Sequence, residues 1–352
     1  MRTELREGLL QEPLGGGKVR CRVCQRRCVV EDGEVGYCRT RRNEGGRLCS
    51  LIYGHVASMA VSPIEKKPLF HYYPGSRWLS LGSLGCNFRC PGCQNWEIAH
   101  ADAREAARAT DYLSPEDAVD LAKRDRCLGI SWTYNEPTLW LEYTLDSAKL
   151  ARADGLLTNY VTNGFATTAA LDLLGPWLDS YRVDIKGFSA ETYRKIAHVD
   201  DPEGIREVVA RARHHWKMHV EVVTNVIPTH NDSPEELRRL AEWIARELGP
   251  DTPWHVTQFA PHLELSHLPA TPVETLEHAR NIGLGAGLRY VYLGNVWGHP
   301  AENTYCYACG ALLIERHGFS IRQNRLEGNC CGNCGVEIHG RWAARDKPGV
   351  LE

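Results

Sequence analysis

The stretch that decides the fold is RWLSLGSLGCNFRCPGCQNW, residues 77–96, in which an apolar run passes directly into closely spaced cysteines. The run Trp78–Leu84 predicts a buried strand, and Cys86, Cys90 and Cys93 follow it. Thiolates at this spacing can bind three corners of a cubane iron–sulfur cluster, which leaves one iron without a protein ligand. Structural zinc is the alternative, but it needs a fourth ligand from elsewhere. The position directly after a strand favours the cluster.

Outward from this stretch, apolar runs alternate with helical patterns as far as residue 298. The runs are Leu128–Tyr134, Leu156–Thr162, Ser180–Ile185, His219–Val226, Trp254–Phe259 and Arg289–Gly294. Ser114-Pro115 and Ser233-Pro234 are typical of helix starts, and Gly249 of a helix end. This alternation predicts parallel β/α units that close into a full or partial TIM barrel, and we expect a partial (β/α)6-type barrel. Chemistry in such barrels lies at the carboxyl ends of the strands.

Polar side chains recur on the later strands of this barrel, mostly where the strands end. They are Asn135, Glu136, Asn163, Asp184, Lys186 and His255. A single polar strand end is more often a solvated turn, but recurrence at successive strands favours a shared pocket. Asp184 and Lys186 lie two residues apart and therefore on one face of their strand. Glu136 could accept a hydrogen bond from an ammonium group.

The C-terminal part, residues 300–352, contains two CxxCG knuckles. Their cysteines are Cys306, Cys309, Cys331 and Cys334, with Cys330 as an adjacent spare. Gly310 and Gly335 allow the tight turn that each knuckle requires. The spacing predicts a zinc ribbon, with a second iron–sulfur cluster as the rival. Such a ribbon either is structural or docks a protein partner or RNA.

The N-terminal part, residues 1–60, is rich in cysteine and arginine and poor in periodic segments. Cys21, Cys24, Cys28 and Cys38 lie within eighteen residues, with Cys49 nearby. They predict a closed tetrathiolate site that holds either zinc or an auxiliary cluster, and the spacing does not decide between these. Because such a composition buries little core, we expect the metal to fix this segment. The barrel, residues 75–298, follows it.

Composition indicates an ordinary globular protein. The chain has 352 residues, a formal net charge of −3, 43% apolar residues and 24% charged residues. No global basic field favours nucleic acid or an anionic membrane. We recognise neither a secretion signal nor an apolar run that could span a membrane. Clustered rather than dispersed cysteines favour metal binding in a reducing compartment, so we expect a cytoplasmic protein.

The central triplet has the spacing of the radical S-adenosylmethionine (SAM) signature. The whole chain resembles the radical SAM component of the AmmeMemoRadiSam system, a relative of the pyruvate formate-lyase activating enzymes. The stretches that carry the resemblance are SPIEKKPLFHYYPG, GCNFRCPGCQNWEI, TYNEPT, TNGF, VDIKGF, PWHVTQFAPH, GLRYVYLGNVWGH and TYCYACG. One departure is Gly92, which stands where this superfamily usually has an aromatic residue.

The resemblance implies a [4Fe–4S] cluster that cleaves SAM reductively, so that a 5′-deoxyadenosyl radical abstracts hydrogen from a macromolecular or partner-bound substrate. It also implies that the segment of Glu136 binds the SAM amino group, that Asp184 and Lys186 contact SAM, and that AMMECR-type and Memo-type proteins cooperate. A reductant such as flavodoxin or ferredoxin would supply electrons. Activation of a glycyl-radical enzyme is the alternative reaction. A non-catalytic iron–sulfur and zinc electron carrier or scaffold is the second alternative.

Overall fold

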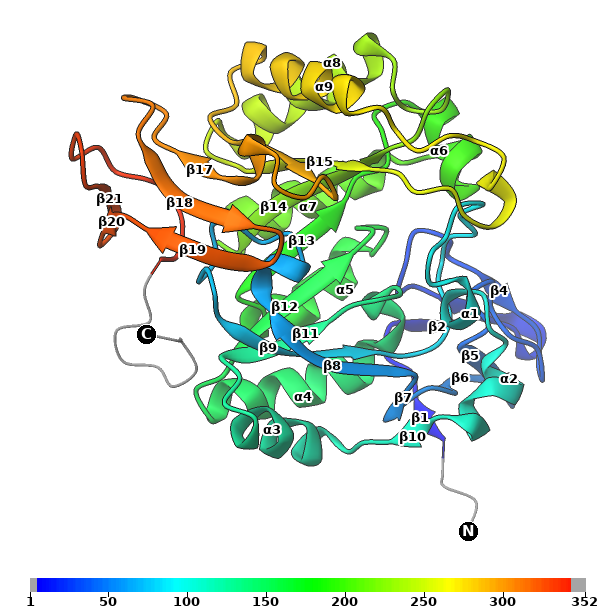
Figure 1. The fold of residues 1–352 in the computed structure, drawn as a ribbon. Helices are drawn as coiled ribbons and strands as arrows, with labels where there is room; N and C mark the ends of the chain where they lie inside the picture. The colour runs from blue at the N-terminus through cyan, green and yellow to red at the C-terminus, as the bar shows by residue number, and fades with distance from the viewer. Residues whose placement is uncertain (1–4, 343–352) are drawn as a thin grey trace.

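An eight-stranded sheet forms the centre of the computed structural model, which describes residues 5–342 (Figure 1). Its strands, in spatial order, are β16 (Val291–Gly294), β15 (Trp254–Gln258), β14 (His219–Val226), β13 (Ser180–Asp184), β12 (Leu157–Thr162), β11 (Gly129–Trp132), β9 (Arg77–Gly82) and β8 (Ser58–Pro63). Neighbouring strands are parallel except β8, which pairs antiparallel with β9. The strands β16 and β8 are the two edges, so the sheet is open.

The seven strands expected from the sequence are confirmed, and they give seven parallel strands rather than the six of a (β/α)6-type barrel. The additional strand β8 was missed. Its side chains are mostly half-buried and it ends at Pro63, which suits the edge position that it occupies. A mixed sequence of this kind carries neither the continuous apolar run nor the clean alternation by which strands are recognised.

Helices connect the parallel strands and cover the outer face of the sheet (Figure 1). They include α3 (Pro115–Arg124), α4 (Leu141–Ala153), α5 (Thr168–Leu174), α6 (Ala190–Ala197), α7 (Glu203–His214), α8 (Pro234–Trp243) and α9 (Val273–Gly285). Both predicted helix starts are confirmed, because Ser114 and Ser233 accept the N-terminal backbone N–H bonds of α3 and α8. One wide π turn extends α8 to Leu248, and Gly249 ends it with a φ of 99°.

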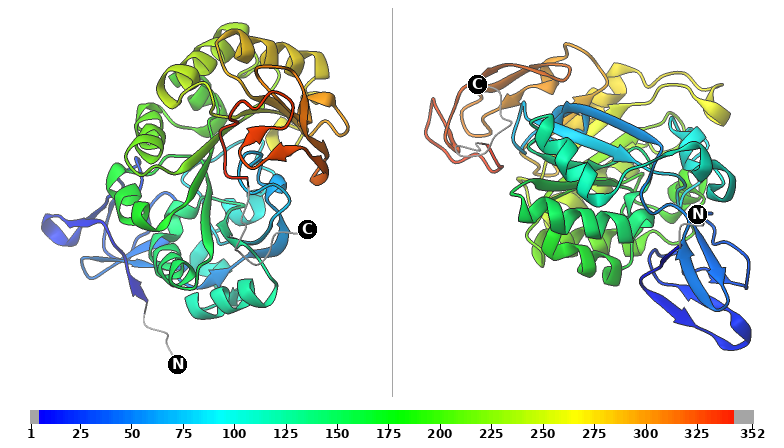
Figure 2. Two further views of the ribbon diagram at one scale, coloured as in Figure 1. Left: turned by 90° about the vertical axis from the view of Figure 1, so that its left-hand side faces the viewer. Right: turned by 90° about the horizontal axis from the view of Figure 1, so that it is seen from below.

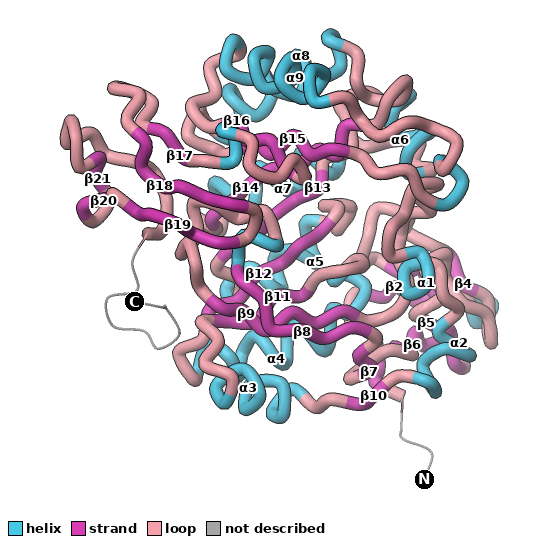
Figure 3. Tube along the Cα trace, viewed as in Figure 1, coloured by secondary structure: helices cyan, strands magenta, loops and turns pink. Residues whose placement is uncertain are grey.

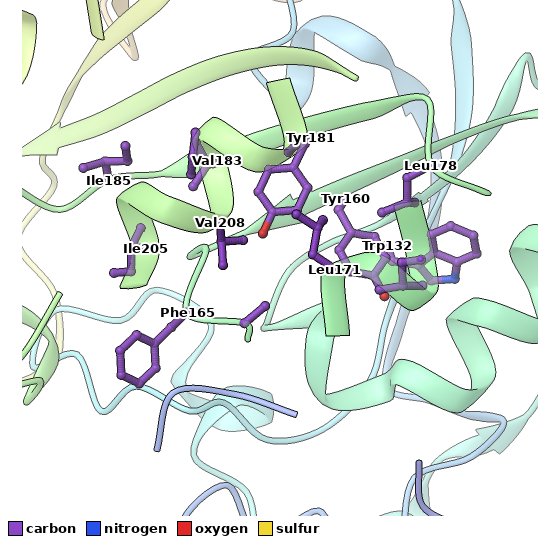
Figure 4. Close-up of a cluster of buried hydrophobic side chains, with 14 of the residues drawn as sticks. Trp132, Tyr160, Phe165, Leu171, Leu178, Tyr181, Val183, Ile185, Ile205 and Val208 are labelled. Carbon is purple, nitrogen blue, oxygen red and sulfur yellow. The ribbon is translucent and has the colours of Figure 1, made fainter. Parts of the chain in front are cut away.

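The core between the sheet and the helices holds the strand ends in place. Figure 4 shows Trp132, Tyr160 and Tyr181 from three successive strands beside Leu171 of α5 and Val208 of α7. All five side chains are buried. Burying an aliphatic side chain such as Leu171 contributes about 1.5–3 kcal/mol. The carboxyl ends of β11, β12 and β13 are therefore fixed relative to one another.

The N-terminal segment folds as two small antiparallel sheets that lie beside the central sheet and its helices (Figure 2). Their strands are β1 (Arg6–Glu7), β2 (Gln11–Pro13), β3 (Val19–Cys21), β4 (Val29–Val30), β5 (Arg41–Glu44) and β6 (Arg47–Ser50). Contrary to the expectation of little core, Val19, Val23 and Leu48 are fully buried and belong to the main hydrophobic core. Apolar contacts therefore hold this segment against the rest of the protein, in addition to any metal that its cysteines bind.

The C-terminal segment lies on the opposite side of the molecule from the N-terminal segment (Figures 1 and 2). It contains β17 (Thr304–Tyr305), β18 (Leu312–His317), β19 (Ser320–Asn324), β20 (Leu326–Glu327) and β21 (Cys330–Cys331), drawn in magenta in Figure 3. Leu313 and Ile314 pack with Tyr290 and Tyr292 in a separate small core. Within residues 5–342, no helix has the length and apolar character that crossing a membrane requires.

Candidate active site and cysteine clusters

The three central cysteines lie in the loop that follows β9. The loop turns at Gly85, whose φ of 81° favours glycine and whose position lacks room for a Cβ, since that atom would lie 2.7 Å from the carbonyl oxygen of Cys38. The Cys86 sulfur accepts hydrogen bonds from the Phe88 backbone N–H at 3.4 Å and from Asn163 Nδ2 at 3.8 Å. Cys93 N donates to the Cys90 carbonyl at 3.2 Å, which holds these two cysteines in one tight turn.

Burial governs the protonation of these thiols. It raises the pKa of Cys86 and Cys93, and that of Cys90 to about 11. The nearby Lys186 opposes this rise at Cys90 and Cys93. Because metals bind the thiolate, ligation here must release protons, and a cation beside the sulfurs favours that release.

The residues that follow β11 form hydrogen bonds with the cysteine loop and with neighbouring strand ends. Asn135 donates to the Gly85 carbonyl through Nδ2 at 2.8 Å and accepts from Ser83 N through Oδ1 at 3.3 Å. Glu136 is 1% exposed, and its carboxylate accepts from Thr138 N and from the next strand end. Burial raises the pKa of this carboxyl group. Both side chains therefore form hydrogen bonds with other residues of the protein.

The end of β12 connects Glu136 with the first cysteine. Thr162 Oγ1 and the backbone N–H of Asn163 donate to the Glu136 carboxylate at 2.8 Å each. The Asn163 amide reaches the cysteine loop, where Nδ2 donates to Asn87 Oδ1 at 2.7 Å. The structure thus brings Cys86, Glu136 and Asn163 together, as the sequence predicted that the strand ends would meet.

The end of β13 places three charges on one face. Asp184 pairs with Arg182 Nη1 and, at 3.6 Å, with Lys186 Nζ. Burial would raise the pKa of Asp184, but these two cations hold it below its ordinary value. Burial would lower the pKa of Lys186, but Asp184 and Cys90 raise it. The ammonium group therefore stays charged beside the cysteines.

His255 lies in a different set of contacts. Its Nε2 bonds to Glu221 at 2.7 Å, and its ring stacks on Tyr292 and meets the edge of Phe70. Burial lowers the pKa of His255. None of these partners belongs to the cysteine loop, so the structure does not join His255 to the strand-end group.

The structure gives a reason for Gly92, the departure from the superfamily pattern. A Cβ at this position would lie 3.1 Å from Leu265 Cδ1 and 3.3 Å from Phe259 Cε2. Both contacts are tighter than ordinary van der Waals distances, so side chains from the end of β15 and the following turn already occupy the space. An aromatic residue at position 92 would therefore require Leu265 and Phe259 to shift.

The C-terminal cysteines form the most compact ligand set in the described part of the chain. The sulfurs of Cys306, Cys309, Cys331 and Cys334 all lie within 4.8 Å of one another. The Cys306–Cys334 and Cys309–Cys331 sulfur–sulfur distances are 3.7 and 3.8 Å. Gly310 and Gly335 each have a φ of 73°, as the predicted knuckles require. The set contains Cys331 and excludes its neighbour Cys330.

The N-terminal cysteines also converge. Cys21, Cys24, Cys28 and Cys38 line a single cavity between the N-terminal sheets and the loop that follows Cys86. Burial raises the pKa of Cys21 to about 11 and raises that of Cys28. Cys49, on β6, does not line this cavity.

Two residues of the site were absent from the sequence prediction. Arg182 precedes Asp184 by two residues on the same strand face, so the alternation that paired Asp184 with Lys186 could also have identified it. Asn87 directly follows Cys86 and receives the Asn163 hydrogen bond. No spacing rule distinguishes it from any other loop asparagine, since its partner comes from a strand end 76 residues away.

Known proteins resemble this chain along most of its length. A family model described as the radical SAM superfamily matches residues 81–244. An uncharacterized protein of Methanocaldococcus jannaschii is 42% identical over 336 residues, which cover 95% of this chain and 99% of that protein. The pyruvate formate-lyase-activating enzyme of Listeria monocytogenes is 26% identical over 187 residues, 49% of this chain and 70% of that enzyme. A solved domain of the pyruvate-formate lyase-activating enzyme from Bacteroides vulgatus aligns with 47% of this chain and 99% of that domain, at 16% identity and a TM-score of 0.42.

Proposed function

This chain belongs to the radical SAM superfamily, and we propose that Cys86, Cys90 and Cys93 bind the [4Fe–4S] cluster at whose open iron SAM is held. When bound, this cluster would supply the single electron for reductive cleavage of SAM to methionine and a 5′-deoxyadenosyl radical. The observation that supports this assignment is the convergence on one cysteine loop of Asn135, Asn163 and Lys186, which come from three successive strand ends.

The chain's own residues orient the ligands and balance their charge. The Phe88 N–H and the Asn163 amide donate to the Cys86 sulfur, and such hydrogen bonds fix the thiolate and tune a cluster's potential. Lys186 places positive charge beside Cys90, which stabilises the more negative, reduced state of a cluster. By donating to the Gly85 carbonyl, Asn135 fixes the position of the cysteine loop relative to the end of β11.

We assign the SAM-facing carboxylate to Asp184 rather than to Glu136. The Asp184 side chain keeps 24% of its surface exposed, whereas that of Glu136 keeps 1% and bonds to backbone and hydroxyl groups of its own chain. Glu136 then acts as a positioning residue that holds Asn163. His255, which packs in the barrel interior, is outside the proposed pocket.

We propose that the substrate is a macromolecule or a partner-bound molecule, from which the radical abstracts a hydrogen atom. The exposed Trp96, which begins α1 (Trp96–Ala99) just after Cys93, offers such a partner an apolar contact close to the cysteine loop. AMMECR-type and Memo-type proteins are the proposed partners, and a flavodoxin or ferredoxin is the proposed reductant in a cytoplasmic setting. Similarity to the Listeria enzyme favours glycyl-radical activation as the second candidate reaction.

We propose that the C-terminal quartet binds zinc. With Zn–S bonds of about 2.3 Å, the sulfurs of a tetrahedral site lie about 3.8 Å apart, which agrees with the observed 3.7 and 3.8 Å. In this view the chain has three parts: an N-terminal metal segment (1–60), the radical SAM barrel (75–298) and the ribbon (300–352).

Electron paramagnetic resonance (EPR) spectroscopy of the dithionite-reduced protein tests the proposed SAM site. Added SAM should change the g values of the cluster signal, because SAM becomes a ligand of the open iron. Asp184→Asn should weaken the SAM concentration dependence of that change, and Asp179→Asn, at the opposite end of β13, is the matched control. A signal insensitive to SAM in the wild-type protein would contradict the proposed function.

A further inference from the structure

The cavity lined by the four N-terminal cysteines has a donor set suited to an anionic sulfur group. Besides Cys21, Cys24, Cys28 and Cys38, its lining includes Arg41 and Asn87. These two side chains are 1% and 0% exposed, and Arg41 Nε and Asn87 Nδ2 have no hydrogen-bond partner in the structure. Buried N–H donors without partners are rare and disfavoured. Thiolates and bridging sulfides in the cavity would accept from them.

The spacing of the four sulfurs distinguishes this cavity from the C-terminal quartet. Among the described residues, only the C-terminal quartet has three or more ligand atoms within 4.8 Å of one another. Its sulfur pairs lie 3.7 and 3.8 Å apart, which fits a single tetrahedral ion. Among the described residues, no three of the four N-terminal sulfurs lie within 4.8 Å of one another, as the ligands of one tetrahedral metal ion would. The wider arrangement fits a cubane, in which each cysteine binds a different iron.

The cavity also adjoins the central cysteine loop. Asn87, which lines the cavity, directly follows Cys86, and its carbonyl accepts from Arg26 Nε at 2.9 Å. Arg89 joins the two segments, donating to the Cys86 carbonyl at 2.7 Å and to the Tyr37 carbonyl at 3.0 Å. Gly85 also closely approaches the Cys38 carbonyl. These contacts show that the N-terminal cysteine cavity and the central cysteine loop are adjacent.

We propose that Cys21, Cys24, Cys28 and Cys38 bind a second [4Fe–4S] cluster that passes single electrons to the cluster at Cys86, Cys90 and Cys93. This inference rests on the proposed function for the electron's destination, but the ligand assignment is independent of it. A low-potential one-electron donor of the flavodoxin or ferredoxin class reduces the N-terminal cluster from the 2+ to the 1+ state. The electron then moves to the central cluster, which is reduced as the N-terminal cluster is reoxidised. No covalent bond changes and no proton is taken up in the transfer.

Metal and sulfide counts on anaerobically reconstituted full-length protein test the ligand assignment. We expect about eight irons and eight sulfides per chain, with one zinc in the ribbon. The double variant Cys24→Ala/Cys28→Ala and the triple variant Cys86→Ala/Cys90→Ala/Cys93→Ala should each keep about four irons. The triple variant retains every N-terminal ligand, so it decides the matter if the double variant does not fold. Cys49→Ser, the matched control, should contain as much iron, sulfide and zinc per chain as the wild type.

EPR of the fully reduced protein tests the relay. Two adjacent paramagnetic clusters couple, so the wild-type signal should show a splitting that both cluster-deletion variants lack. A wild-type spectrum equal to the sum of the two variant spectra would overturn the relay. A count of about four irons with two zincs would overturn the cluster assignment. Formation of 5′-deoxyadenosine separates the two proposals: its absence from protein with both clusters contradicts only the proposed function, and its presence in protein with two zincs contradicts only this inference.

Discussion

The ion pair between Arg41 of β5 and Glu142 of α4 ties the N-terminal segment to this helix, and Glu142→Gln should weaken the attachment. Both side chains are 1% exposed. The carboxylate accepts from Arg41 Nη1 at 2.9 Å and Nη2 at 2.7 Å, and from Leu9 N at 2.7 Å. Glutamine keeps the shape but removes the carboxylate charge that pairs with the buried guanidinium group. Removing one partner of a buried pair costs about 3–5 kcal/mol.

That energy corresponds to an increase of roughly 100- to 5,000-fold in the opening equilibrium of the segment. Native-state hydrogen exchange measures it at the backbone N–H groups of Asn43 and Leu51, which bond to other backbone groups of this segment. The exposed pair between Lys123 and Asp154 supplies the control, and Asp154→Asn should change stability by about 0–1 kcal/mol. An effect of Glu142→Gln no larger than that of Asp154→Asn would refute the reasoning.

Three further changes test separate parts of the structure. Gly92→Tyr should overpack its site, destabilise the protein by about 1–3 kcal/mol and lower the iron content that remains after gel filtration. The additional substitution Leu265→Ala should restore the iron content. An unchanged iron content in the single variant would contradict the packing argument. Cys309→Ser should remove the ribbon's zinc and leave the irons in place, as inductively coupled plasma mass spectrometry would show; loss of iron instead would place a cluster in the ribbon. Lys186→Met should shift the central cluster's midpoint potential to more negative values, on the order of 59 mV for a tenfold change in the one-electron equilibrium. Lys186→Arg should not, and redox titration followed by EPR distinguishes the two.

The parallel sheet was predictable because its strands are largely buried and most of them read as apolar runs. Trp132, Tyr160 and Tyr181 show this pattern, and the polar residues that follow their strands meet as the fold requires. Strand alternation alone placed Asp184 and Lys186 on one face, and the structure also pairs their charges. Local periodicity therefore gave the scaffold and the general position of the site.

What the sequence did not reveal depends on contacts between distant residues. Arg41 and Glu142 are 101 residues apart, and neither has a neighbour that marks it as half of a buried pair. Val19, Val23 and Leu48 stand singly among polar residues, so their shared burial against the barrel has no periodic signal. The apolar side chains that crowd position 92 belong to Phe259 and Leu265, far along the chain.

The most direct test of the central claim is a quantitative assay for 5′-deoxyadenosine. The reconstituted protein is reduced anaerobically with dithionite and incubated with SAM, and the product is measured by liquid chromatography with mass spectrometry. The wild type should form 5′-deoxyadenosine and methionine in equal amounts, while Cys90→Ser should form neither and keep its ribbon zinc. Equal SAM cleavage by the wild type and a homogeneous Cys90→Ser protein would contradict the assignment of the central cysteines.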